Sequence, residues 1–172
     1  VIIGLGNPGP HYYATRHNIG FRVLDQLAQN FGATFRKSNN IEVAKIVVNE
    51  KDLLLIKPQT FMNSSGEIIP VLKKDGIVAE QIVVVHDELE LPFGEVKLKK
   101  GGSHKGHNGL KSIISFIGPD FYRVRCGIGR PEKKEAVPNY VLAKFSENDA
   151  AVDSLITDAC NIAISLLLLK RD

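Results

Sequence analysis

Five short polar segments of this 172-residue chain carry side chains that could bind or transform a substrate. They are Asn7 and residues 15–18, 61–63, 86–87 and 101–109. Each is expected in a turn, before a helix or at the end of an apolar run, where loops commonly carry binding residues. Because the strand ends of an open α/β sheet meet in one crevice, we expect these segments to converge there. Taken singly, Asn7, Asn63 or Asn108 could instead cap a helix or a turn.

His17 and Asp87 supply the imidazole and the carboxylate that general-base catalysis requires. We predict that the Asp87 carboxylate accepts the Nδ1 proton of His17, so that Nε2 can deprotonate water. A histidine on its own is more often a hydrogen-bonded structural residue, and its pairing with an aspartate at a strand end is what favours catalysis. The chain has no G-x-S-x-G nucleophile motif. We therefore expect water, rather than a side chain, to be the nucleophile.

A metal centre is the main alternative for the same part of the sequence. Its candidate ligands are His86, Asp87, Glu88, Glu90, His104 and His107. The chain has neither the HExxH motif nor the paired CxxC spacing that are typical of zinc sites. We therefore expect no metal and no other cofactor.

The three asparagines Asn7, Asn63 and Asn108 favour a substrate with carbonyl or amide groups, such as an ester, because carboxamides suit neutral polar groups better than phosphates. Residues 95–134 indicate a second feature. They hold ten Lys and Arg residues against three acidic ones, a net charge of +7 in a chain of net charge +3. Such a concentration is typical of polyanion binding, although a solvated basic face has the same composition. The residues suited to phosphates are Lys97, Lys99, Lys100, Lys105, Arg123 and Arg125. Together these features predict a nucleic acid that bears an acyl group.

Residues 4–9 match the G-x-G-x-x-G dinucleotide motif directly after an apolar run. That mechanism needs a helix beginning at the second glycine, with its N-terminus on a pyrophosphate. Pro8 and Pro10 interrupt such a helix, and apolar residues at helical spacing begin only near Ile19. We therefore predict a tight loop that presents Asn7, and no nucleotide site.

Length and composition predict one globular domain spanning residues 1–172. The chain is 44% apolar and 24% charged, as is ordinary for soluble proteins. No apolar run approaches the roughly 18 residues that span a bilayer, so we expect no membrane role. Two cysteines cannot build a disulfide framework, which favours reduced thiols and a cytoplasmic location.

Hydrophobic spacing predicts strands at residues 1–5, 41–48, 53–56, 82–85, 94–99 and 121–128. It predicts helices at residues 19–31, in a short stretch towards residue 74, at residues 106–117 and from about Asn148. Ser64 followed by Glu67 is a capping-box pattern for the second helix, which Pro70 must kink or delay. This order predicts an α/β fold: a single domain with a mixed β-sheet flanked by helices on both faces.

Six ordered motifs resemble those of bacterial-type peptidyl-tRNA hydrolases over essentially the whole chain. They are GLGNPG (4–9), TRHNIG (15–20), FMNSSG (61–66), HDEL (86–89), GHNGL (106–110) and RCGIG (125–129). The resemblance implies a carboxylic-ester hydrolase that binds the acceptor end of peptidyl-tRNA and frees the tRNA for translation, a form of ribosome rescue. It also implies a metal-free and usually monomeric enzyme. One departure is the last helix, which stops at Asp172, earlier than the resemblance implies.

The resemblance also implies roles for individual residues. His17 would take a proton from the attacking water, Asp87 would orient it, and Asn7 would sense the peptide bond that distinguishes peptidyl-tRNA from aminoacyl-tRNA. The residues implied to contact the rest of the substrate are Tyr12, Phe61, Met62, Asn63, Asn108, Lys99 and Arg125. Among these, Met62 would line the pocket, and Lys99 and Arg125 would hold tRNA phosphate.

Two other functions stay open. Plastid relatives of this fold act in intron splicing as RNA-binding proteins, and an esterase or amidase for small N-acylated compounds would need no nucleic acid. The intact His17, Asp87 and asparagines favour the enzyme over the splicing protein. Salt-dependent tRNA binding would separate it from the small-ester enzyme.

Overall fold

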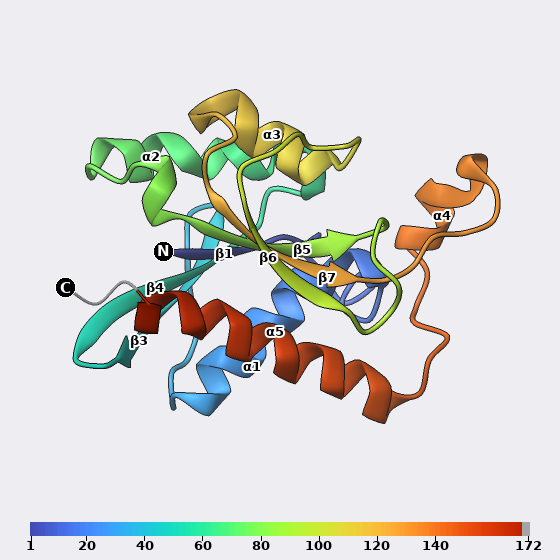
Figure 1. Ribbon diagram of the computed structural model, residues 1–172. Helices are drawn as coiled ribbons and strands as arrows, with labels where there is room; N and C mark the ends of the chain where they lie inside the picture. The colour runs from blue at the N-terminus through green and yellow to red at the C-terminus, as the bar shows by residue number, and fades with distance from the viewer. Residues whose placement is uncertain (170–172) are drawn as a thin grey trace.

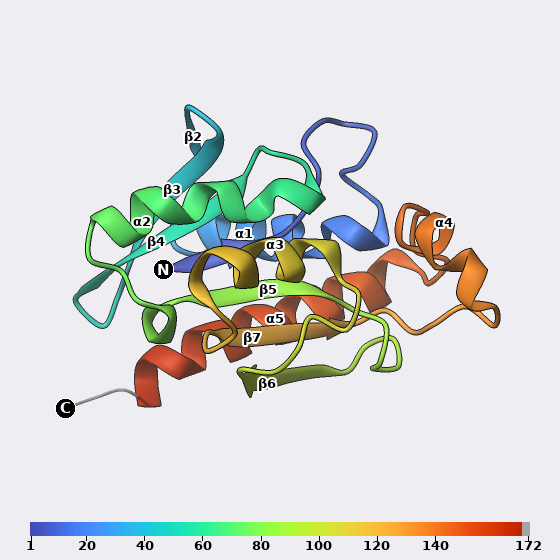
Figure 2. The same cartoon turned by 90° about the horizontal axis from the view of Figure 1, so that it is seen from above.

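A seven-stranded mixed β-sheet runs through the middle of the molecule, and helices cover both of its faces (Figures 1 and 2). The computed structural model describes residues 1–169, so the expected end of the last helix at Asp172 lies outside the described residues. The strand order is β2-β3-β4-β1-β5-β7-β6. The strands are β1 (Ile2–Gly4), β2 (Arg36–Ser38), β3 (Ile41–Val48), β4 (Lys51–Pro58), β5 (Val83–Glu88), β6 (Val96–Lys100) and β7 (Tyr122–Gly127). The predicted fold class is confirmed.

The four central strands β4, β1, β5 and β7 run parallel to one another, while β2, β3 and β6 are antiparallel to their neighbours. The carboxyl ends of β5 and β7 therefore point to the same edge of the sheet, and the short helix α4 (Val137–Val141) lies beyond them (Figure 1). Ligands of open α/β sheets bind at such an edge. Of the polar segments singled out in the sequence, Asn7 follows β1, residues 61–63 follow β4, and residues 86–87 lie at the end of β5, whereas residues 101–109 follow the edge strand β6.

Two hydrophobic cores hold the layers together, one on each face of the sheet. On one face α1 (Ile19–Asn30) and α5 (Asp149–Leu169) pack against side chains such as Val85 and Val124. On the other, α2 (Ile69–Lys74) and α3 (Asn108–Ile117) cover Ile3 and Val84. Alternate residues of β5 thus enter opposite cores, as the two-residue period of a strand requires.

A close backbone contact sets where α1 begins. A Cβ atom on Gly20 would lie 2.4 Å from the carbonyl oxygen of Val85 and 2.5 Å from the backbone nitrogen of Leu5. Only glycine therefore lets the first turn of α1 rest on the ends of β1 and β5. This contact brings His17, three residues earlier, to the carboxyl end of β5. Gly4 and Gly6 likewise pack against Gly20 and the Phe21 ring, so they serve packing rather than a pyrophosphate.

Some predicted boundaries are wrong. β5 continues through His86 and Asp87 to Glu88, so these polar residues belong to the strand itself. The capping box does not form: residues 62–68 make 3-10 turns kinked at Ser64, with no side-chain cap. Pro70 was expected either to kink the second helix or to delay its start. The helix α2 starts late and carries this proline in its first turn. The short elements β2 and α4 were not predicted, because neither segment has a clear apolar period.

Candidate active site

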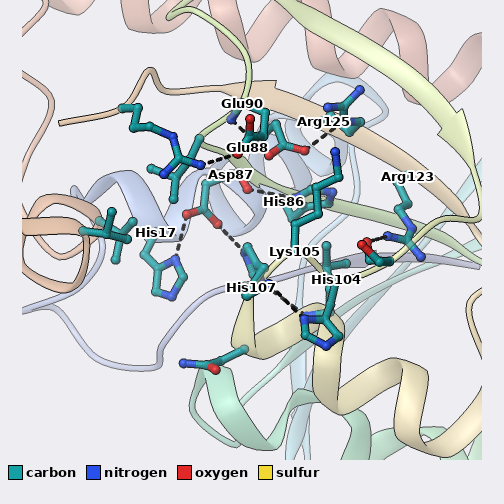
Figure 3. Close-up of a pocket in the computed structure, with 18 of the residues that line it drawn as sticks. His17, His86, Asp87, Glu88, Glu90, His104, Lys105, His107, Arg123 and Arg125 are labelled. Carbon is teal, nitrogen blue, oxygen red and sulfur yellow. Dashed lines mark hydrogen bonds and ion pairs between the residues drawn. The ribbon is translucent and has the colours of Figure 1, made fainter. Parts of the chain in front are cut away.

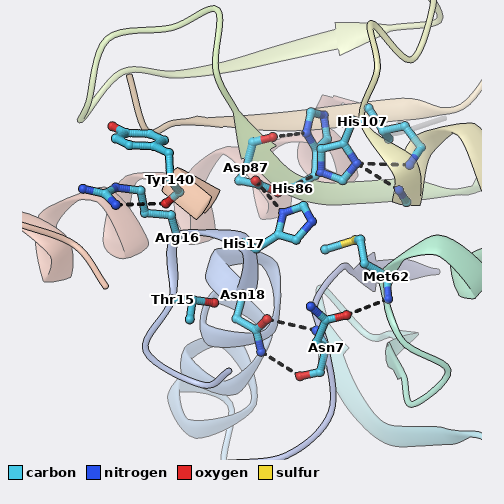
Figure 4. Close-up of polar contacts among 12 residues, drawn as sticks. Asn7, Thr15, Arg16, His17, Asn18, Met62, His86, Asp87, His107 and Tyr140 are labelled. Atoms are coloured by element: carbon cyan, nitrogen blue, oxygen red, sulfur yellow. Dashed lines mark hydrogen bonds and ion pairs between the residues drawn. The ribbon is translucent and has the colours of Figure 1, made fainter. Parts of the chain in front are cut away.

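Three side chains meet at the carboxyl end of β5 (Figure 4). His17 comes from the 3-10 turn Arg16–Asn18, Asp87 from β5, and His107 from the residue that precedes α3. Nδ1 of His17 lies 2.8 Å from Oδ2 of Asp87, and Nε2 of His107 lies 2.7 Å from Oδ1 of the same carboxylate. Each oxygen of the buried Asp87 thus has its own imidazole partner.

Hydrogen bonding assigns the tautomers of both imidazoles. Nδ1 of His107 accepts the backbone N–H groups of Gly109 at 3.1 Å and Leu110 at 3.3 Å, as the N-cap of α3. Neutral His107 therefore carries its proton on Nε2 and donates it to Asp87. Asp87 in turn accepts Nδ1–H of His17, which leaves Nε2 of His17 unprotonated and without a protein partner among the described residues. An imidazole in this state can accept a proton from water.

The electrostatics of the cluster keep Asp87 charged and make His17 more basic. Burial alone would raise the pKa of Asp87, but the charges of His17 and His107 and their hydrogen bonds hold that pKa well below its ordinary range. Burial alone would lower the pKa of His17, yet the charge and the hydrogen bond of Asp87 raise it above 6.5. The cluster therefore pairs a permanent anion with an imidazole that is a stronger base than usual.

His86 lies beside the cluster, with its ring 5.3 Å from that of His107, and it is a buried part of the cavity lining. Burial, together with the charge of His107, lowers the pKa of His86 to about 4, so its ring stays neutral near pH 7. Its Nδ1–H donates to the backbone carbonyl of Asp87 at 2.8 Å, and its buried Nε2 has no hydrogen-bond partner within residues 1–169. His86 thus steadies the backbone that carries Asp87.

Asn7 is held by hydrogen bonds on three sides (Figure 4). Its Oδ1 accepts the backbone N–H of Met62 at 2.7 Å. Its backbone N–H donates to Oδ1 of Asn18, and its carbonyl accepts from Nδ2 of the same residue, both at 2.9 Å. Only Nδ2 of Asn7 has no protein partner among the described residues. Asn18 was not predicted as a site residue, although it directly follows His17 in the sequence.

Phe61 stands at a strained position. Its φ of 66° and ψ of 156° are rare for a residue with a Cβ atom, and such strain is typical of functional sites. The ring is 51% exposed and meets the Tyr12 ring edge to face, with centroids 6.2 Å apart. The next residue, Met62, is buried, and its sulfur packs on Gly109. The predicted substrate residues Tyr12 and Phe61 are thus in contact, and Met62 directly follows Phe61.

Neither Asn63 nor Asn108 serves as a cap. Asn63 is exposed and makes no side-chain hydrogen bond in the described part of the chain, and the helix cap that Asn108 could have formed is made by His107. Asn108 is also exposed and borders the cavity beside His17 and Asp87. Both carboxamides are therefore available to a ligand.

A cavity of about 660 Å³ opens beside His17 and Asp87 (Figure 3). Its cationic side chains are Lys99, Lys105, Arg123, Arg125, Arg130 and Lys134. Strand alternation explains two of them: on β7, Val124 and Cys126 enter the core under α5, which turns Arg123 and Arg125 to the opposite face. The cavity brings together the predicted residues His17, Asp87, Asn108, Lys99 and Arg125, whereas Asn7, Tyr12, Phe61, Met62 and Asn63 lie outside its lining.

Arg123, which we counted among the basic residues suited to phosphates, binds the protein itself. It is buried, and its guanidinium donates to the backbone carbonyls of Ser103 at 2.8 Å, Gly102 at 2.5 Å and Pro119 at 3.2 Å. Both terminal nitrogens of Arg123 therefore donate hydrogen bonds to the protein backbone. Arg123 therefore braces the glycine-rich loop that leads to His107 and Asn108.

The same cluster has the composition of a metal site. Among the described residues, His17, Asp87 and His107 offer ligand atoms within 4.8 Å of one another, and two imidazoles with a carboxylate suit zinc. This set differs from the predicted candidates, which included neither His17 nor its turn. In the present arrangement the same three side chains are joined by two hydrogen bonds, so a metal would have to replace two protons.

A family model described as peptidyl-tRNA hydrolase matches residues 1–171. The chain belongs to the peptidyl-tRNA hydrolase family. Curated peptidyl-tRNA hydrolases of Dichelobacter nodosus and Syntrophotalea carbinolica are 49% and 42% identical to it, and the alignments cover 92% and 99% of this chain and 92% and 91% of those proteins. The crystal structure of peptidyl-tRNA hydrolase from Acinetobacter baumannii is 41% identical, covers 98% of this chain and 86% of that one, and superposes with a TM-score of 0.87.

As a member of the peptidyl-tRNA hydrolase family the chain is a carboxylic-ester hydrolase, in agreement with the resemblance of its motifs. Among the described residues, no helix is both long and apolar enough to cross a membrane.

Proposed function

We propose that the chain hydrolyses the ester bond between peptide and tRNA in peptidyl-tRNA, with water activated by His17. One observation carries this proposal: at the border of a cavity rich in cations, a buried aspartate holds Nδ1 of His17, and none of the described residues binds its Nε2. An activated water suits an ester, and the cations suit the phosphates of the attached tRNA. Membership of the peptidyl-tRNA hydrolase family supports this substrate.

The reaction follows from the tautomers. Water attacks the ester carbonyl and gives a proton to Nε2 of His17, while the carbonyl electron pair moves to oxygen. The resulting imidazolium donates Nδ1–H to Asp87, whose charge stabilises it. When the tetrahedral intermediate collapses, the ester bond to the ribose breaks, and the leaving oxygen takes the proton from Nε2. The products are the free peptide acid and the tRNA, which returns to translation.

Asn7 is the residue that we propose to recognise the peptide. Its Oδ1 is committed to the backbone N–H of Met62, which fixes the amide and leaves Nδ2 as a donor. A peptide carbonyl would accept from this donor, and a free α-ammonium group could not. Discrimination against aminoacyl-tRNA would result. Tyr12, Phe61, Met62, Asn63 and Asn108 would contact the rest of the peptide and the tRNA end.

Lys99 and Arg125 are the residues that we propose to hold tRNA phosphate. Both border the cavity, whose lining does not include Asn7, so phosphate and peptide would be held by different groups of residues. The double variant Lys99→Ala with Arg125→Ala should weaken tRNA binding and flatten its dependence on salt, by about one unit of slope per lost phosphate contact. An unchanged slope would favour an enzyme for small esters.

The decisive experiment is an assay of peptide release from N-acetylated aminoacyl-tRNA, with and without chelator. We expect activity in both conditions, and its loss in His17→Ala with tRNA affinity near normal. Release that fails in the intact protein would favour an RNA-binding role instead. Loss of activity on chelation would show that the His17, Asp87 and His107 cluster works as a metal centre.

The setting of the reaction is a further part of the proposal. We expect a monomer that acts in the cytoplasm and rescues tRNA from stalled or aborted translation. Two free buried cysteines, Cys126 and Cys160, are consistent with a reducing compartment. Equilibrium sedimentation would show whether one copy is the active unit.

A further inference from the structure

Two arginines at the cavity are each paired with a glutamate from the end of β5 or the turn after it. Arg125 pairs with Glu88, and Arg130 pairs with Glu90. A carboxylate and a phosphate compete for the same guanidinium, so each glutamate bears on any phosphate that binds here. The two pairs differ in which guanidinium nitrogen contacts the glutamate and in how deeply the two side chains are buried.

The Arg125 pair is side-on and sheltered. Nε of Arg125 donates to Oε1 of Glu88 at 2.8 Å, and the two side chains are only 16% and 14% exposed. Oε2 of Glu88 accepts the backbone N–H of Glu90 at 3.2 Å, which fixes the carboxylate. Burial would raise the pKa of Glu88, but the hydrogen bond from Arg125 and neighbouring charges lower it, so the carboxylate stays ionised. Among the described residues, the terminal nitrogens of Arg125 have no protein partner.

The Arg130 pair is end-on and open to solvent. Nη2 of Arg130, a terminal nitrogen, contacts Oε1 of Glu90, and the side chains are 45% and 43% exposed. Such exposed pairs contribute little and exchange readily with solvent. A phosphate that approached Arg130 would meet a nitrogen already occupied by carboxylate.

We propose that Arg125 and Arg130 form a two-arginine site for RNA phosphate in which Glu88 positions one arginine and Glu90 competes for the other. Glu88 takes only Nε and so aims the two terminal nitrogens of Arg125 outward, where a phosphate can bind both. Glu90 occupies Arg130 in the free protein and gives way when RNA binds. The inference rests on the proposed function for Arg125 and adds Arg130, Glu88 and Glu90 to it.

The test compares two variants that remove the same charge. Binding of deacylated tRNA is measured at several salt concentrations for Glu88→Ala and Glu90→Ala, so that no chemical step enters the readout. Glu90→Ala should tighten binding about two- to fivefold, because it removes a competitor from an exposed pair. Glu88→Ala should weaken binding about two- to tenfold, because a freed Arg125 must be ordered when RNA binds. Electrostatics alone would tighten both.

Three controls make the comparison specific. Glu88→Gln keeps an oxygen that can accept from Nε, so it should bind at least as well as the parent protein. Asp158→Ala removes the same charge from the exposed side of α5, across the sheet, and should change affinity less than either glutamate variant. Arg130→Ala should lower the salt slope by about one.

The outcomes separate this inference from the proposed function. If Arg125→Ala leaves tRNA binding unchanged, the proposed phosphate contact itself is wrong. If Arg125→Ala weakens binding but Glu88→Ala tightens it or leaves it unchanged, the positioning role of Glu88 is overturned alone. Unaltered binding in Glu90→Ala or an unaltered salt slope in Arg130→Ala would overturn the second half of the site.

Discussion

Replacing Asp87 with asparagine tests the tautomer argument most directly. In the parent protein the Asp87 carboxylate accepts two N–H groups, one from His17 and one from His107. A carboxamide has one oxygen and one NH₂ group, so it can accept from only one ring and must donate to the other. His107 cannot be the acceptor without giving up its cap of α3, since its Nδ1 already accepts from Gly109 and Leu110. The amide oxygen therefore turns to His107 and the NH₂ group to His17.

The consequence is an inactive tautomer of His17. Nδ1 must accept from the amide, so the proton moves to Nε2, and the base that faces the ester is lost. The neutral amide also fails to stabilise imidazolium. Together these effects should lower kcat by on the order of 10⁴, the loss that follows when the aspartate of a Ser-His-Asp triad is replaced by asparagine. Single-turnover release of peptide from N-acetylated aminoacyl-tRNA measures this, with tRNA affinity as the control for folding.

A second substitution should partly reverse the effect. In Asp87→Asn with His107→Ala, nothing holds the amide oxygen away from His17, so the amide can rotate and restore the active tautomer. The cap that enforced the wrong orientation is worth about 0.5–2 kcal/mol, which corresponds to a recovery of roughly 2- to 30-fold. His107→Ala alone should not raise the activity of the parent. Activity of Asp87→Asn within tenfold of the parent, or a double variant slower than Asp87→Asn, would refute the reasoning.

The raised pKa of His17 predicts that kcat/KM falls as the pH drops, with a midpoint above 6.5, because only the unprotonated ring accepts a proton; a pH-rate profile with a lower midpoint would contradict this. The pKa of His86 is lowered to about 4, so below pH 6.5 the unfolded chain binds a proton that the folded protein does not. The free energy of unfolding should therefore fall by about 3 kcal/mol as the pH drops from 6.5 to 4. His86→Asn keeps a donor for the Asp87 carbonyl but cannot be protonated, so urea unfolding should show a smaller loss of stability over that pH interval than in the parent protein. Equal losses would mean that other groups cause the acid sensitivity. Gly20→Ala should cost about 3 kcal/mol or more in the same assay, since its Cβ would overlap the backbone of Val85 and Leu5. A smaller cost would show that α1 can shift.

Periodicity was sufficient to predict the layers because each long element has a clear apolar pattern. The predicted strand at residues 41–48 coincides with β3, and the helix predicted from residue 19 begins there as α1. Pro8 and Pro10 correctly excluded a nucleotide-binding helix after the first strand. The order of strands and helices also predicts that polar residues at the ends of central strands converge, which favours pairing His17 with Asp87, and these side chains lie 2.8 Å apart.

The role of His107 could not be predicted, because it depends on a two-residue shift in the start of a helix. With a helix from Gly106, His107 would lie inside the first turn, whereas α3 begins at Asn108 and makes His107 the cap. That position commits Nδ1 to the backbone and aims Nε2 at Asp87. Arg123 illustrates the same limit. Its charge was evident, but the carbonyls of Gly102, Ser103 and Pro119 that it binds come from loops whose paths no local pattern determines.

The last three residues of β5 join the two halves of the proposed reaction. Asp87 holds the base, Glu88 aims Arg125, and His86 supports the carbonyl between them. Because neighbouring residues of a strand point to opposite faces, Asp87 can turn towards His17 while Glu88 turns towards the cations. A shift of this strand by one residue would exchange the faces and break both contacts at once. Gly20 opposes such a shift, since it packs directly on the backbone of Val85. Gly20→Ala should therefore impair tRNA affinity and turnover together, whereas His17→Ala affects turnover alone.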